Sequence, residues 1–208
     1  MSAEFDLGGV VVEVSTSSEE CQQWINRGAV QMFGFNPEEA IRCFRKALYF
    51  SPDCAMAHYF IAHCCAPNYN DASGLDCSQG LKEAQMALET ASQAPAGLED
   101  WESAMIKAKP HQFTDEESGD GVSRSYCNAM RPVYEKFGEE NTLVAAVFAE
   151  SLMMLAPWTL WTSQPDVKPA IPETEGAGES SGERSRERPH PPRPLPLLHP
   201  HHGAVGQS

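Results

Sequence analysis

The most constraining feature of this sequence is a pattern of small and large residues that recurs with a period of about 34 residues. The first copy begins at Trp24 and closes at Pro52, and the second begins at His58, one period after Trp24. Small residues in such a pattern let the two helices of a pair approach closely, and large ones fill the space between pairs. The positions that carry it are Trp24, Gly28, Ala40, Phe44, Ala47, Pro52, Ile61, Ala62, Ala84 and Leu88. The pattern predicts stacked pairs of helices, an all-α fold.

Prolines and capping residues predict where these helices begin and end. Ser17 and Glu20 have the spacing of a capping box, and Asn36 with Pro37 forms a second start signal. Pro132 is expected to bend the helix that contains it. The expected helices cover residues 18–33, 37–51, 53–66, 78–94, 98–108, 123–137 and 140–155.

Charge and composition exclude several classes of protein. The chain has 15 basic and 29 acidic residues, a net charge of -14, so an evenly basic surface for nucleic acid is not expected. Its apolar runs are too short to cross a bilayer, and the first residues are acidic where a signal peptide is basic. Seven cysteines without a CxxC pair indicate reduced, buried thiols. We therefore expect a cytoplasmic protein that binds neither nucleic acid nor membrane.

Composition also divides the chain into three regions. Residues 1–17 are expected to be flexible, 18–160 to form the helical repeat domain, and 161–208 to be a disordered tail rich in Pro, Gly, Arg and His. Residues 174–208 contain six Pro, four His, four Glu and four Arg, so this stretch adds nothing to the net charge. Its PHPPRPLPLL segment has the P-x-x-P spacing of polyproline ligands, although a disordered linker explains it as well.

The repeat positions resemble the tetratricopeptide repeat (TPR) family. The segment GFNPEEAIRCFRKALYFSPDCAMAHYFIAHCCAPNYN resembles an uncharacterised branch of that family, and the similarity covers about residues 22–160. The resemblance implies a right-handed superhelix of about three helix pairs plus a final helix. It also implies a non-catalytic scaffold that binds a peptide or partner helix in a concave groove, with no cofactor.

The same resemblance implies where a partner would bind. The first helix of each pair lines the groove, which gives Asn26, Ala29, Tyr59 and His63. The acidic body favours a basic or apolar protein or peptide as the partner. The loop PNYND interrupts the second repeat, and long loops in compact arrays are often functional. Its candidate binding residues are Asn68, Tyr69 and Asn70.

Two alternatives stay open. Cys54, His58, His63 and Cys64 have ligand chemistry and helical spacing, so they could form a metal or small-molecule site beside the PNYND loop. Packing at repeat positions explains these residues as well. The second alternative is a truncated isoform without independent function, because further helices normally follow the PWTLW segment in the resembling branch.

No catalytic constellation is evident. The G-x-S-x-G spacing occurs once, as GESSG at residues 178–182, but it lies in the expected disordered tail and not between a strand and a helix, as a nucleophile elbow requires. The sequence has no phosphate-binding G-x-x-x-x-G-K-[ST] and no G-x-G-x-x-G. The acidic loop at residues 115–121 lacks the residue order of a calcium loop. We therefore expect a protein that is not an enzyme and needs no metal.

Overall fold

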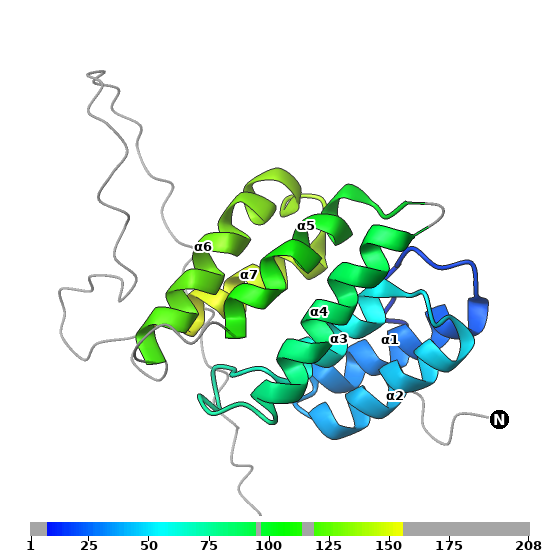
Figure 1. Ribbon diagram of the computed structural model, residues 1–208, viewed down its shortest axis with the longest axis horizontal. Helices are drawn as coiled ribbons and strands as arrows, with labels where there is room; N and C mark the ends of the chain where they lie inside the picture. Colours follow the sequence, from blue (N-terminus) through cyan, green and yellow to red (C-terminus); the bar gives the residue numbers. More distant parts are fainter. Residues whose placement is uncertain (1–7, 95–96, 114–118, 156–208) are drawn as a thin grey trace, which may run out of the picture. The chain divides into compact units, whose positions relative to one another are not determined.

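Capping residues and prolines alternate with apolar helical stripes, and this alternation produces a fold of helices joined by turns and by one longer loop between α3 and α4 (Figure 1). The computed structural model describes residues 8–94, 97–113 and 119–155, all within one unit of the chain. These residues contain no strand, so the all-α prediction is confirmed. The helices are α1 (Glu19–Phe33), α2 (Pro37–Phe50), α3 (Ala55–Cys65), α4 (Cys77–Gln93), α5 (Asp100–Ala108), the 3₁₀ helix η1 (Lys109–Phe113), α6 (Gly119–Phe137) and α7 (Thr142–Met153). The predicted tail, 161–208, lies outside the described residues.

The caps correct one sequence expectation. Ser18, and not Ser17, caps α1, and its hydroxyl accepts a hydrogen bond of 3.1 Å from the Cys21 amide. Asn36 precedes α2 as predicted, but its side chain makes no capping bond. Asp76 caps α4 by accepting from the Gln79 amide at 2.9 Å. Side-chain oxygens in this position satisfy amides that the first turn leaves unpaired.

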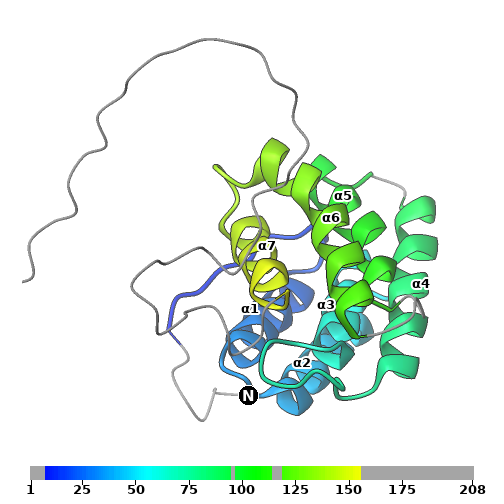
Figure 2. The same cartoon turned by 90° about the vertical axis from the view of Figure 1, so that its left-hand side faces the viewer.

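Consecutive helices pack against each other as pairs. α1 packs on α2, α3 on α4 and α6 on α7, and α3 also contacts α1 and α5 (Figures 1 and 2). Gly28 explains the close approach of α1 and α2, because a Cβ there would lie 2.4 Å from a ring carbon of Phe44. Phe44 then stacks on Phe60 of α3, with ring centroids 5.0 Å apart. The small and large positions of the sequence pattern therefore meet across the helix pairs.

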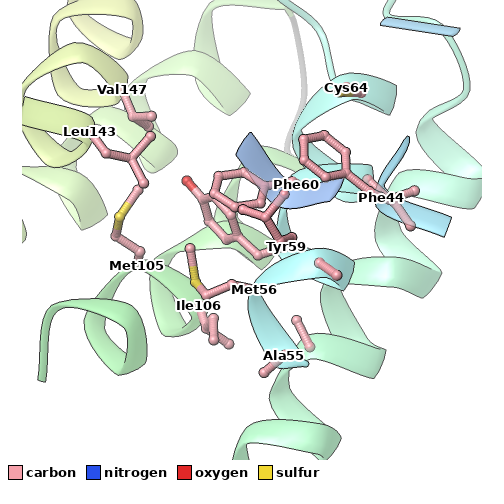
Figure 3. Packing of buried hydrophobic residues seen from close by; sticks show 14 of the residues in the cluster. Phe44, Ala55, Met56, Tyr59, Phe60, Cys64, Met105, Ile106, Leu143 and Val147 are labelled. Carbon is pink, nitrogen blue, oxygen red and sulfur yellow. The ribbon is translucent and has the colours of Figure 1, made fainter. Parts of the chain in front are cut away.

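Helix α3 is the central core element. Nine of its eleven residues are buried, so it is apolar on nearly every side. Figure 3 shows Tyr59 and Phe60 of α3 with Phe44 of α2 on one side and Met105 of α5 on the other. A polar side chain that this helix carries must therefore find its partners inside the protein.

The segment before α1 packs on the helices, and the expected flexibility of residues 1–17 stays a prediction. Residues 1–7 lie outside the described residues, but Val12 and Val14 pack against the core. The Val14 amide donates to the side chain of Gln22 at 3.0 Å. Apolar contacts and a hydrogen bond from the backbone to a side chain of α1 therefore connect residues 12–14 to the helices.

Candidate functional site

A buried lysine lies at the junction of four helices. Lys109, the first residue of η1, is fully buried. Its Nζ lies 2.9 Å from His63 Nδ1, 2.8 Å from Gln112 Oε1 and 3.0 Å from the Tyr126 hydroxyl. The rings of Tyr59 and Tyr126 also face the nitrogen, with centroids at 4.6 and 4.7 Å. An ammonium group has three donors, so these three acceptors satisfy it completely.

His63 connects this lysine to a carboxylate on α7. Its Nε2 lies 3.1 Å from Glu150 Oε2, while Nδ1 faces Lys109. When Nδ1 accepts from Lys109, the ring proton resides on Nε2 and is donated to Glu150. The side chain of His63 is 8% exposed and that of Glu150 is 27% exposed. The chain Lys109–His63–Glu150 therefore runs from the core to a surface that solvent reaches.

Burial sets the ionisation of these groups. It lowers the pKa of Lys109 to about 7, against the opposing effect of Glu150. Burial, and secondly Lys109, lowers the pKa of His63, which therefore stays neutral at pH 7. Burial alone would raise the pKa of Glu150, but its interactions with His63 and Lys109 outweigh this and lower it. Glu150 is thus an ionised carboxylate at neutral pH.

The loop that contains PNYND is an ordered part of the same region. Asn68 Oδ1 accepts from the amides of Asn70 and Asp71 at 2.9 and 3.0 Å. Gln112, whose carbonyl oxygen accepts from Lys109, donates its amide to Pro67 O at 3.0 Å. Gln112 of the buried network therefore binds the start of the loop at Pro67, and Asn68 stabilises a turn within the loop.

A pocket of about 380 Å³ opens between this loop, the turn from α1 to α2, the end of α3, and α7. Its apolar lining comes mainly from Met32, Phe35 and Leu75. Its ionisable lining consists of Glu38, Asp71, Glu150 and His63, with the Cys64 thiol beside them; the remaining lining residues are Pro37, Asn68 and Asn70. Hydrogen bonds from Ser73, chiefly from its hydroxyl, lower the pKa of Asp71. The pocket combines apolar walls with carboxylates, a lining that suits a cation on an apolar stem. We name it the loop pocket.

The structure places the predicted binding residues in different environments. His63, Asn68 and Asn70 line the loop pocket together. Tyr59 is fully buried in the core, where no partner reaches it, so its expected place in an open groove is corrected. Asn26 accepts a hydrogen bond from Val12, and Tyr69 lies in the loop but does not line the pocket.

The alternative metal cluster does not assemble. Within the part of the chain that the structure describes, no group of three or more His, Cys, Asp or Glu residues could hold a metal ion. His58 pairs with Glu83 of α4 at 2.7 Å, and His63 pairs with Glu150. A hydrogen bond with Cys54, the main influence, lowers the pKa of Cys21 to about 7. Cys54, His58, His63 and Cys64 lie on one helix and its N-cap, but Cys54, His58 and His63 interact with different residues.

Sequence reasoning missed the residues that surround His63. Lys109, Gln112, Tyr126 and Glu150 come from three elements that follow α4, and no motif joins them. A lysine near the end of a helix and before a proline is typical of an exposed, dipole-stabilising residue. Only the three-dimensional packing shows that this one is buried.

No protein-family model, curated protein or solved structure matches this chain. The TPR resemblance therefore stays a prediction. None of the helices in the described ranges combines the length and apolar character needed to cross a bilayer.

Proposed function

We propose that this protein is a non-catalytic, cytoplasmic scaffold of the tetratricopeptide repeat type that binds a basic and apolar peptide segment through the loop pocket. The pocket's lining carries the proposal, because three carboxylates and three apolar side chains surround one cavity. A lysine or arginine side chain matches this lining, with its methylene stem on the apolar wall and its charge beside the carboxylates.

The packing of the helices supports the repeat part of the proposal. Successive helices contact one another, and α3 contacts α1 and α5 as first helices do in a stacked array. Gly28 against Phe44 supplies the small-to-large contact expected within a pair.

The buried network orients one carboxylate of the loop pocket, that of Glu150. Glu150 is oriented by His63, which Lys109 orients in turn, so the carboxylate does not have to be ordered when a partner binds. Groups that are already oriented lower the entropic cost of binding.

The test is binding of fluorescein-labelled synthetic peptides in which one arginine is flanked by leucines, measured by fluorescence anisotropy. We expect the combined substitution Glu38→Gln and Glu150→Gln to raise the Kd at least about tenfold, because two carboxylates are neutralised. The matched control combines Glu89→Gln with Glu135→Gln, which removes the same charge from exposed positions of α4 and α6 that do not line the pocket. Equal Kd values for both variants and the unaltered chain would overturn the proposal.

A further inference from the structure

The segment before α1 is bound through its backbone by side chains of that helix. The Val12 amide donates to Asn26 Oδ1 at 2.9 Å, and the Val12 carbonyl accepts from Gln22 Nε2 at 2.7 Å. Gln22 Oε1 accepts from the Val14 amide at 3.0 Å, and Gln22 Nε2 also bonds to Asn26 Oδ1 at 2.9 Å. Two amide side chains thus hold three backbone groups of an extended chain, a mode of recognition that does not depend on the sequence held.

The side chains of the segment alternate as they do in an extended peptide lying in a groove. Val12 and Val14 pack against the core, whereas Val11 is 62% exposed and Glu13 is exposed. A two-residue period with one face buried is the signature of a strand on a surface. The segment is drawn dark blue in Figures 1 and 2.

The far end of the segment is held by a buried carboxylate of α5. Glu102 is fully buried, and its Oε1 accepts from the Ser15 amide at 2.8 Å. Its Oε2 accepts from the Ser15 hydroxyl and, at 3.0 Å, from the Glu99 amide. A carboxylate that holds both an amide and a hydroxyl of one residue selects serine or threonine there.

The near end of the segment borders an open cavity. A space of about 560 Å³ lies beside residues 10–13 and is lined mainly by Phe33 of α1, Trp101 of α5, and Leu143 and Ala146 at the start of α7. Val10 is half exposed at this end. The segment therefore leaves part of the space between itself and α1, α5 and α7 unfilled.

We propose that α1, α5 and α7 form a binding groove for an extended peptide, and that residues 10–16 are its intramolecular occupant. The partner is an extended segment with apolar, β-branched residues at alternate positions followed by serine or threonine. The chain's own segment blocks the groove until such a partner displaces it. This groove shares no lining residue with the loop pocket, so the proposal stands independently of the function proposed above.

The experiment uses the full chain and a fluorescein-labelled peptide with the sequence of residues 8–17, GGVVVEVSTS. Val12→Asp combined with Val14→Asp places charges on the buried face of the segment and releases it. We expect the released chain to bind the peptide at least about tenfold more tightly than the unaltered chain, whose tethered segment competes at a high effective concentration. Val11→Asp is the control for an added charge in the segment, because it places one carboxylate at an exposed position and leaves Val12 and Val14 packed.

Two further substitutions locate the bound peptide. Adding Gln22→Ala and Asn26→Ala to the released chain removes the side chains that hold the backbone, and we expect the gain in affinity to disappear. Replacing the serine of the peptide that corresponds to Ser15 by alanine should weaken binding several-fold, because Glu102 loses a hydroxyl donor. A released chain with an unchanged circular dichroism spectrum and no affinity for the peptide would overturn the proposal.

Hydrogen exchange on the unaltered chain tests without any substitution whether the segment leaves the groove. This measurement also tests the proposal if the released chain does not fold. We expect the Val12 and Val14 amides to exchange at least about tenfold faster than the Ile25 amide in α1, because a displaceable segment opens without global unfolding. Equal exchange rates would identify the segment as a permanent part of the core. A dimer of the unaltered chain in light scattering, with segments exchanged between copies, would also contradict an intramolecular occupant.

Discussion

At the scale of single residues, Lys109 is the group whose environment differs most from that of an ordinary surface residue. Burial lowers its pKa from 10.5 to about 7 in the folded protein. Between those two values the unfolded chain binds more protons at this residue than the folded one, so its contribution to stability grows as pH rises and is lost as pH falls to about 7.

Replacing Lys109 isolates this contribution. We expect the free energy of unfolding of the unaltered chain, minus that of Lys109→Met, to rise between pH 7 and 9.5 by up to about 1.4 kcal/mol per pH unit. Denaturant titrations at several pH values measure it, and Lys107→Met at an exposed neighbouring position is the control. If plots of the free energy of unfolding against pH run parallel for Lys109→Met and the unaltered chain, the lysine does not titrate in this range.

Gly28 tests the close approach of α1 and α2. A methyl group there would gain about 1 kcal/mol of helix propensity but would overlap a Phe44 ring that is fully buried and stacked on Phe60. Overpacking of this kind costs about 1–3 kcal/mol, so we expect Gly28→Ala to destabilise the protein despite the better helix former. Urea unfolding measures the change. Gly9→Ala meets no atom within 4 Å and serves as the control, and a stabilised Gly28→Ala variant would contradict the packing described.

At the scale of elements, local signals in the sequence account for most of the fold. Helix starts at residues 19, 37 and 77 lie within two residues of the predicted positions, because caps and prolines act on neighbouring backbone groups. The buried network was not predictable in this way. His63 was expected in a groove or at a metal site, and its true partners Lys109 and Glu150 lie 46 and 87 positions later in the chain. Which of several ligand-like residues meet is decided by tertiary packing and not by local spacing.

The caps themselves differ in strength, and this difference can be measured. Asp76 makes a capping hydrogen bond at the start of α4, whereas Asn36 makes none at the start of α2. We expect Asp76→Ala to lower the free energy of unfolding by about 1 kcal/mol and Asn36→Ala to lower it by less than about half of that. Chemical denaturation at pH 7 compares the two, and the reverse order would show that the cap of α2 contributes in a way its geometry does not reveal.

At the scale of the whole molecule, α3 couples the first helices to the last. It contacts α1, α2, α4 and α5, and its His63 reaches Glu150 on α7. Phe60, fully buried on α3, stacks on Phe44, so Phe60→Ala should cost about 3–5 kcal/mol. We expect it to raise hydrogen exchange in α1 and in α7 alike, because Phe60 stacks on Phe44, against which Gly28 of α1 packs, and because the same helix carries His63, which pairs with Glu150 of α7.

Phe50→Ala provides the comparison for this last prediction, because it also removes a phenylalanine ring, but from the end of α2, where the side chain is 38% exposed. It should cost less than about 1 kcal/mol and leave exchange in α7 unchanged. Exchange that rises in α1 but not in α7 after Phe60→Ala would mean that the helix pairs unfold separately. In that case the buried Lys109–His63–Glu150 chain would orient the Glu150 carboxylate in the loop pocket, but it would not couple the unfolding of the first helices to that of α7.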